Sequence, residues 1–412
     1  MAKEPPHPTI RDQARELSTS PLRGEVRSRL PYDDVALAVP VTVPYVRHSI
    51  RGAHWFLARA LAELLKSSGL RKDAIDGLTV SSLTLAPDTA VGLAQQLGLS
   101  PRWLDHIPMG GASGIVALRR AARAVQSGDA NVVACLAGDT NHVDSFRRSL
   151  ESFSQFARDA TYPYGAGGPN MVFALITAHY MRVAGAKPED FGKLCVAQRE
   201  NARQFPHALL QSPLTLGQYL GARMIADPLR LFDCVMPCAG AEAFLVMRAD
   251  LARRHGLKFA RVLGTIERHN AFAEDPIALR GGWALDRDEL YAQAGAGPDE
   301  MDFVETYDDY PVMNMIQFEG LGLCREGDAP DFVRRHTFTT DGTCPLNTSG
   351  GQLSCGQAGA AGGFLGLVEA IRQLTGQTPG ARVPDPRRGL VSGYGMVTYD
   401  RGVCSGAAVV GA

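Results

Sequence analysis

Apolar positions along the chain follow two spacings in alternation, one typical of buried strands and one typical of amphipathic helices. β-branched or alternating apolar runs predict strands over residues 35–46, 77–84, 131–137, 239–247, 260–266, 303–306, 389–399 and 403–410. Apolar residues three or four apart predict helices over residues 51–67, 91–97, 115–125, 171–184, 191–203, 287–294, 311–318 and 364–374. Strands that alternate with helices favour an α/β architecture.

The order of these elements repeats in outline, which predicts two similar α/β halves rather than one continuous sheet. We expect an N-terminal extension at residues 1–32, a first half at 33–255 and a second half at 256–412. The first half carries a loop insertion at 141–230, which begins where the regular pattern breaks. Long insertions of this kind often form lids or ligand walls.

Composition narrows the class of protein. The 412 residues are 45% hydrophobic and 21% charged with a net charge of −1, so we expect neither nucleic acid nor an anionic membrane as partner. No apolar run is long enough to cross a bilayer, and the first residues lack the apolar core of a secretory signal. We therefore expect a cytoplasmic protein. The eight cysteines are dispersed without a Cys-x-x-Cys pair, so no metal site is predicted.

A turn of small residues, Gly110 to Gly114, stands directly before an apolar helical pattern. Enzymes place nucleophiles on such turns, because free N–H groups and the helix dipole stabilise an anion there. This turn contains no cysteine, and Ser113 is its single hydroxyl. The turn is therefore that of a nucleophile site without the expected nucleophile.

In the second half, Tyr307-Asp-Asp-Tyr310 follows a predicted strand and precedes Pro311, which suits the first turn of a helix. Taken alone, the two tyrosines are compatible with core aromatics, and Asp308 and Asp309 with helix caps. Two glycine-rich turns follow, at 347–351 and 356–363.

These motifs, in this order, resemble the thiolase superfamily from about residue 35 to the C-terminus, and most closely the thiolases of the sterol-carrier-protein type. Gly111-Ala-Ser-Gly resembles the family's Cys-Ala-Ser/Thr-Gly elbow, and Glu305-Thr-Tyr-Asp-Asp-Tyr310 stands where that group has Glu-x-His-Asp-Cys-Phe. Three further landmarks keep the family's order: Ile225-Ala-Asp-Pro-Leu-Arg-Leu-Phe-Asp-Cys234, Phe318-Glu-Gly-Leu-Gly-Leu-Cys324 and Asn347-Thr-Ser-Gly-Gly351. The resemblance implies a five-layer αβαβα fold and acyl-CoA thioesters as substrates.

The departures from the family fall on its catalytic positions. Gly111 replaces the nucleophilic Cys, Tyr307 the oxyanion His, Asp309 the acid/base Cys and Gln357 the His of Gly-His-Pro. A glycine cannot form the acyl-enzyme of ordinary thiolases.

A pocket of this kind can still stabilise a thioester enolate through oriented donors. The chain thus resembles the nucleophile-less thiolase-like aldolases of steroid side-chain degradation. The resemblance implies retro-aldol cleavage of a 3-hydroxyacyl-CoA, no covalently bound cofactor, a homodimer, and a possible small partner subunit with an OB-fold and a zinc ribbon. We predict Tyr307, Asp309, Gln357 and Gly111 as the catalytic positions. The predicted pocket residues are Ser113, Asp308, Tyr310, Cys355 and Gly351.

Other interpretations remain open from the sequence alone. A relocated thiol, Cys355 or Cys404, would support acyl transfer, and a non-catalytic thiolase-fold subunit is the alternative outside enzymes. The sequence does not choose between Tyr307 and Asp309 as the base. The acyl group, the residues that contact CoA and the direction of the reaction also stay open.

Overall fold

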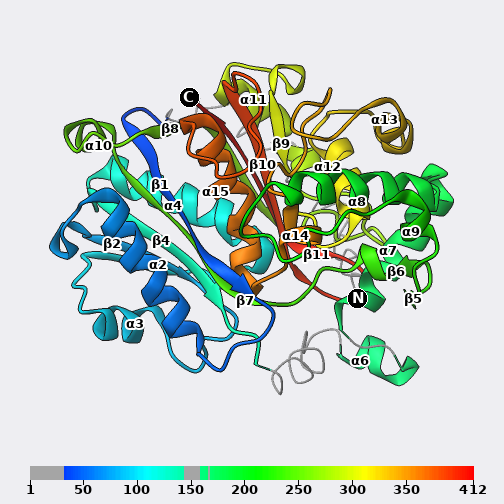
Figure 1. Cartoon of the computed structure of the whole chain (residues 1–412), viewed down its shortest axis with the longest axis horizontal. Helices are drawn as coiled ribbons and strands as arrows, with labels where there is room; N and C mark the ends of the chain where they lie inside the picture. The colour runs from blue at the N-terminus through cyan, green and yellow to red at the C-terminus, as the bar shows by residue number, and fades with distance from the viewer. Residues whose placement is uncertain (1–31, 143–157, 166–167) are drawn as a thin grey trace, which may run out of the picture. The chain divides into compact units, whose positions relative to one another are not determined.

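One mixed sheet of nine strands organises the protein (Figure 1). The computed structural model describes residues 32–142, 158–165 and 168–412. In this part of the chain the strand order is β3-β2-β4-β7-β1-β8-β11-β10-β9. The strands are β1 (Val35–Val46), β2 (Gly77–Ser81), β3 (Trp103–His106), β4 (Val132–Asp139), β7 (Ala239–Arg248), β8 (Phe259–His269), β9 (Phe303–Glu305), β10 (Arg388–Val397) and β11 (Gly402–Gly411). A separate hairpin pairs β5 (Met224–Ala226) with β6 (Leu229–Arg230).

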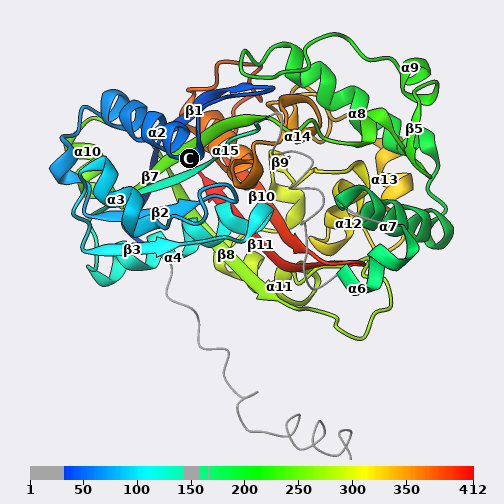
Figure 2. The ribbon, with the colours of Figure 1, turned by 90° about the horizontal axis from the view of Figure 1, so that it is seen from below.

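Helices lie on both faces of this sheet and between its halves (Figures 1 and 2). The central helices α4 (Ser113–Ser127) and α15 (Gly362–Thr375) pack on each other and contact strands of both halves. Helices α2 (Ala53–Ser68) and α3 (Ala90–Leu97) cover the outer face of the first half, and α11 (Trp283–Ala294) that of the second. This is the five-layer αβαβα arrangement that the sequence predicts.

The remaining helices surround the second half. Helices α7, α8, α12 and α13 share one apolar core with the outer face of the second half-sheet. Their bounds, with those of the short helices, are α6 (Arg158–Thr161), α7 (Pro169–Ala184), α8 (Pro188–Arg203), α9 (Leu216–Leu220), α10 (Ala249–Arg254), α12 (Pro311–Gly320), α13 (Ala329–Arg335) and α14 (Gly351–Cys355). In the described residues, none of the helices is long and apolar enough to span a bilayer.

One expectation about the halves is wrong in detail. Their sheets are not separate, because Ala36–Ala38 of β1 pair antiparallel with 259–261 of β8 and join all nine strands. The pairing covers three residues, so it leaves the halves otherwise distinct. Residues 1–31, 143–157 and 166–167 lie outside the described residues, so the N-terminal extension and these parts of the predicted insertion remain predictions. The rest of the insertion is described and contains α6 to α9 and the β5–β6 hairpin. Tyr32 is buried, and its hydroxyl lies 2.6 Å from Oγ1 of Thr265.

A buried cluster of charged side chains lies where α15 packs on β1 and β7. Thr42 donates to Oε2 of Glu242 (2.8 Å) and accepts from Nη2 of Arg372 (2.6 Å). Nη1 of Arg372 lies 3.5 Å from Oε2 of Glu369. Burial raises the pKa of Glu242 to about 8, although Arg372 and the hydrogen bond from Thr42 act against this rise. Two carboxyl groups thus face one guanidinium without solvent.

Glu242→Gln should therefore change how stability depends on pH. The folded protein keeps the Glu242 proton up to about pH 8, whereas an unfolded Glu loses it near pH ~4.3. The parent's free energy of unfolding should fall across this window as the pH rises, and the variant should escape that fall. We expect the variant's stability relative to the parent to rise by up to ~1.4 kcal/mol per pH unit between pH 5 and 8.

Chemical denaturation at several pH values measures this difference. Glu200→Gln, at an exposed ion pair with Arg203, is the matched control and should give no such slope. A difference between Glu242→Gln and parent that stays constant across the window would show that Glu242 is ionised throughout.

Candidate active site

The ring of Tyr307 occupies the space that a side chain on residue 111 would need. Gly111 lies in the 3₁₀ turn Gly110–Ala112 that precedes α4, and Tyr307 follows the end of β9. A Cβ on Gly111 would lie 2.0 and 2.1 Å from Cε2 and Cζ of Tyr307, and 2.3 Å from the carbonyl oxygen of Tyr394. These distances are far below van der Waals contact. The structure therefore brings Gly111 and Tyr307 together, and the glycine is a condition for the position of the ring.

The backbone of Tyr307 is held by a single side chain from α12. Gln317 donates from Nε2 to the carbonyl oxygen of Tyr307 (2.6 Å) and accepts from its N–H at Oε1 (3.1 Å). Ser392 on β10 donates to the same Oε1 (2.7 Å). All of these groups are buried, and both backbone polar groups of Tyr307 are satisfied without a neighbouring strand. The ring is thus carried by a fixed main chain.

The phenol of Tyr307 ends a chain of two side-chain amides. Nε2 of Gln357 donates to the Tyr307 hydroxyl oxygen (3.1 Å) and to Oε1 of Gln352 (3.2 Å). Burial raises the pKa of Tyr307 well above its ordinary value, and the carboxylates of Asp309 and Asp308 raise it further. The phenol is therefore neutral at physiological pH and keeps its proton for donation.

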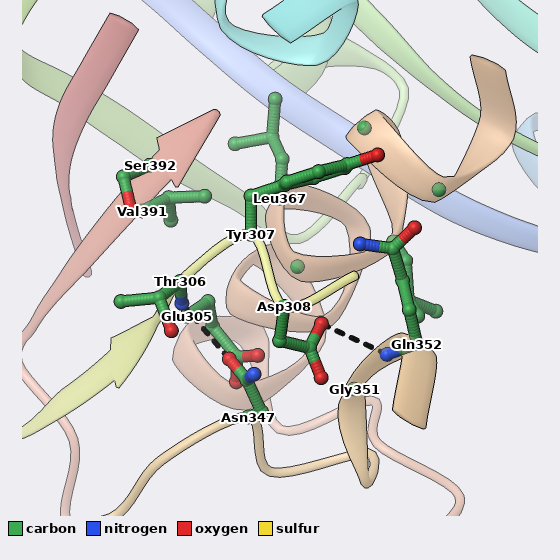
Figure 3. A pocket seen from close by; sticks show the side chains of 14 residues that line it. Glu305, Thr306, Tyr307, Asp308, Asn347, Gly351, Gln352, Leu367, Val391 and Ser392 are labelled. Carbon is green, nitrogen blue, oxygen red and sulfur yellow. Dashed lines mark hydrogen bonds between the residues drawn. The ribbon is translucent and has the colours of Figure 1, made fainter. Parts of the chain in front are cut away.

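Asp308 caps the short helix α14 (Figure 3). Its Oδ1 accepts from the N–H of Gln352 (2.9 Å) and its Oδ2 from the N–H of Leu353 (3.3 Å). Gly351 has a φ of +60°, and a Cβ there would lie 2.0 Å from Oδ2 of Asp308. Burial raises the pKa of Asp308 to about 7, while the two N–H groups act against that rise. Asp308 and Gly351 therefore form the structural floor of the pocket.

Asp309 has a different environment from its neighbour. Its side chain is buried, and Oδ1 has no hydrogen-bond partner among the described residues. Burial, and then the charge of Asp308, raise its pKa well above the ordinary value. The next residue, Tyr310, donates to Oδ1 of Asn170 (2.5 Å) and stacks on Phe173 with ring centroids 4.1 Å apart. Tyr310 thus ties this loop to the start of α7. Asp309 acts on Tyr307 through its charge, but neither Asp309 nor Tyr310 is among the residues that line the pocket containing Tyr307.

Ser113 has its hydrogen bonds within the turn. Its hydroxyl donates to the carbonyl oxygen of Ile107 (3.1 Å) and accepts from the N–H of Met109 (3.1 Å). The side chain is fully buried and does not line the pocket that contains Tyr307. Its geometry is that of a residue that holds the turn in shape.

Neither of the two candidate thiols is activated. Sγ of Cys355 donates to the carbonyl oxygen of Ser349 (3.1 Å), and burial raises its pKa well above the ordinary value. Sγ of Cys404 lies 3.9 Å from Sδ of Met109, and burial raises its pKa to about 12. A nucleophilic cysteine needs a lowered pKa, so both remain thiols at neutral pH. Among the described residues, no group of three or more His, Cys, Asp or Glu side chains is arranged to hold a metal ion.

The pocket beside Tyr307 also has polar residues that the sequence does not assign to the site. These are Glu305, Asn347, Gln352 and Ser392 (Figure 3), and Ser392 donates in turn to Oε1 of Gln317. Gln352 follows directly after the Asn347–Gly351 motif and lies in the buried helix α14. A polar residue at such a place is the one sign in the sequence that Gln352 belongs to the site. The sequence does not reveal that the amide faces Tyr307, because that depends on the three-dimensional course of α14.

Gly111→Ala should destabilise the protein because the new methyl group overlaps the Tyr307 ring. Overpacking of a core costs ~1–3 kcal/mol, and the contact with the Tyr394 backbone raises the cost. Thermal denaturation of Gly111→Ala, Tyr307→Ala and the double variant forms a cycle. We expect the double variant to be less destabilised than the sum of the two single changes, by ~0.5–3 kcal/mol. Strict additivity would mean that the ring yields to the methyl group at no cost.

The sequence of this chain is similar to a family model and to several known proteins. Residues 265–404 match the thiolase C-terminal domain-like family. The 17-hydroxy-3-oxo-4-pregnene-20-carboxyl-CoA lyase of Mycobacterium tuberculosis is 30% identical over 348 residues, which are 81% of this chain and 89% of the relative. The steroid side-chain-cleaving aldolase of Thermomonospora curvata is 29% identical over 351 residues, 81% of this chain and 88% of the relative.

Among solved structures, the Ltp2-ChsH2(DUF35) aldolase superposes with a TM-score of 0.79 at 26% identity, covering 93% of this chain and 98% of that one. A monomeric SCP2-thiolase-like protein of Mycobacterium smegmatis shares the fold, with a TM-score of 0.68 at 16% identity. The resemblance inferred from the motifs is confirmed: the chain belongs to the thiolase superfamily and is similar to its thiolase-like aldolases.

Proposed function

We propose that this protein is a lyase that cleaves a carbon–carbon bond of a 3-hydroxyacyl-CoA by a retro-aldol reaction. The observation that carries the proposal is the phenol of Tyr307 in the place of a nucleophile's side chain. The names of the two relatives, a lyase of a CoA ester and a side-chain-cleaving aldolase, support the same chemistry.

The reaction needs a base and an electrophilic donor but no covalent intermediate. The base removes the proton of the 3-hydroxyl group, and the bond between C2 and C3 breaks. The fragment that contains C3 leaves as an aldehyde or ketone. The electron pair of the broken bond stays on C2 and forms the enolate of the thioester. Protonation of the enolate at C2 gives the shortened acyl-CoA. A pocket lined by fixed donors stabilises the enolate oxygen.

The environments of Asp309 and Tyr307 favour different roles in this reaction. Asp309 is buried with an oxygen free to accept a proton, and its raised pKa makes it a stronger base than an exposed carboxylate. Tyr307 is neutral, and its oxygen already accepts from Gln357, so its O–H is available to donate. We therefore assign Asp309 as the proton acceptor and Tyr307 as the donor to the enolate oxygen. Gly111 makes room for the ring.

Acyl transfer through a relocated thiol has no support in the described residues. The thiols of Cys355 and Cys404 are buried, and burial raises the pKa of both. Tyr307, Gln352 and Gln357 instead form a polar cluster around the pocket, which a purely structural subunit does not need.

Further parts of the proposal rest on the relatives. We infer that the acyl group is bulky, as the names of the steroid-acting relatives suggest, and that the thioester is substrate rather than a resident cofactor. The name Ltp2-ChsH2(DUF35) aldolase joins two components, which supports a small partner subunit for this chain as well. A homodimer and a cytoplasmic location belong to the same proposal.

Tyr307→Phe keeps the ring and removes the hydroxyl. We expect turnover of a cleaved 3-hydroxyacyl-CoA to fall by ~10²–10⁴-fold, because a positioned proton donor is lost. Thermal stability should change little, since the ring still fills the space beside Gly111. Mass spectrometry of the products from a panel of 3-hydroxyacyl-CoA esters measures the rate. Near-normal turnover by this variant would make Tyr307 a core aromatic and exclude the mechanism.

Asp309→Asn tests the base. The amide cannot accept the hydroxyl proton, so turnover should fall by a similar ~10²–10⁴-fold while the thioester still binds. In the parent, the ionised form of Asp309 grows as the pH rises towards its raised pKa, so kcat/KM should increase with pH on the acid side. If Asp309→Asn loses turnover but its remaining kcat/KM still rises with pH on the acid side, a group other than Asp309 causes that rise.

Incubation with acetyl-CoA should leave the intact mass of the protein unchanged. Gly111 offers no nucleophile, and the two candidate thiols remain protonated. A stable acetyl adduct that peptide mapping assigns to Cys355 or Cys404 would favour the acyl-transfer alternative over the lyase.

A further inference from the structure

The amide of Gln357 has no hydrogen left for a substrate. An amide nitrogen carries two hydrogens. Nε2 of Gln357 gives one to the Tyr307 oxygen (3.1 Å) and one to Oε1 of Gln352 (3.2 Å). The backbone of Gln357 is held as well, since its N–H donates to Met236 and its carbonyl accepts from Cys238. Gln357 therefore orients its neighbours and is poorly placed to donate to a ligand.

The side-chain amide of Gln352, in contrast, has hydrogens left to donate. Its side chain is buried and lines the pocket beside Tyr307, and Nε2 has no hydrogen-bond partner in the described part of the chain. An unpaired buried donor is costly, and such groups are rare in folded proteins. Oε1 of Gln352 is fixed by Gln357, which turns Nε2 toward the side of Tyr307 and Asp308 (Figure 3). The donor thus faces the pocket beside Tyr307 and Asp308, where the amide lowers the pKa of both groups, and it makes no full hydrogen bond among the described residues.

Glycine at position 362 makes room for this amide. A Cβ on Gly362 would lie 2.2 Å from Oε1 of Gln352, so a larger residue would displace it. The main chain of Gln352 is fixed independently, because its N–H donates to Asp308. Substitution of the side chain therefore leaves the cap of α14 in place, and the amide can be tested separately from the fold.

We infer that Gln352, rather than Gln357, donates the amide hydrogen bond to the oxygen of a CoA thioester, beside the hydroxyl of Tyr307. The inference rests on the proposed function in taking a CoA thioester as the ligand. In the ground state the acceptor is the thioester carbonyl oxygen, and in the reaction it is the enolate oxygen. Two donors then meet this oxygen, one a phenol and one an amide, and both are neutral. Their hydrogen bonds strengthen as negative charge develops, so Gln352 acts mainly on kcat.

Binding of two probes tests the inference without any need for cleavage. Acetyl-CoA has the thioester carbonyl group, whereas S-ethyl-CoA has a methylene group in place of that carbonyl and so lacks the oxygen. Calorimetry on the full chain should show that the parent prefers acetyl-CoA. Gln352→Met, which keeps the length and loses the donor, should reduce that preference about tenfold, and the preference that remains is due to the Tyr307 hydroxyl. Gln373→Met, which removes a buried amide from the last turn of α15, is the matched control and should keep the preference.

Gln357→Met separates the two amides. Reduction of the preference in Gln352→Met with its retention in Gln357→Met is the expected pattern. The reverse pattern, or a parent that binds both probes equally, overturns the inference. If Gln352→Met fails to fold by circular dichroism, Gln352→Leu replaces it with the same expectation. Gln352→Met should also lower kcat for a cleaved 3-hydroxyacyl-CoA by ~10²–10³-fold with a smaller change in KM.

The proposed function can fail separately. If the parent cleaves none of the 3-hydroxyacyl-CoA esters, the lyase proposal is wrong, and the preference for acetyl-CoA over S-ethyl-CoA still decides the role of Gln352. A kcat loss without any change in that preference would assign Gln352 to the support of Gln357 and contradict the donor role.

Discussion

The close approach of two glycine turns at the centre of the molecule fixes everything around the site. A Cβ on Gly114, in the first turn of α4, would lie 2.1 Å from the carbonyl oxygen of Gly363, in the first turn of α15. A Cβ on Gly363 would lie 2.7 Å from the carbonyl oxygen of Gly111. The two central helices can therefore begin against each other only without side chains at these points. Because each helix also contacts both halves of the sheet, this contact sets the distance between the layers and the place of the pocket.

Next to the turn that precedes α4, the ring of Tyr307 fills the space that a side chain on Gly111 would need. Gly111, which the motifs match to the nucleophile of ordinary thiolases, has no side chain, and a phenol ring from the other half of the fold occupies the space. The two neighbouring carboxylates, Asp308 and Asp309, also differ in their hydrogen bonds. Asp308 uses its oxygens to accept from the N–H groups of α14, whereas Asp309, one residue later, keeps an unpaired oxygen. Adjacent residues after a strand point in different directions, so one builds the pocket and the other is free to react.

Periodicity in the sequence is sufficient to predict most long helices and strands. It does not predict short strands or the pairing of strands that lie far apart in the sequence. It predicts Val35–Val46 over its full length, because twelve residues of apolar and β-branched character leave little ambiguity. It does not predict strand β3, since Trp-Leu-Asp-His lacks alternation and exists through its pairing with β2. The same holds for the three-residue pairing that joins the two halves. The motifs predict Tyr307 and Asp309, but the donor of Gln352 becomes visible only when each hydrogen of the amides is assigned to a partner.

Burial of the site explains why its chemistry suits neutral donors better than a thiolate. Loss of solvent raises the pKa of Tyr307, of both carboxyl groups and of the nearby thiols in the same direction. A thiolate nucleophile is disfavoured in such surroundings unless a cation or a helix N-terminus compensates for the lost water. A phenol and an amide lose nothing as donors there, and a carboxylate becomes a better base. Burial thus keeps the thiol of Cys355 protonated, and it suits the neutral donors and the carboxylate base that the proposed retro-aldol cleavage needs.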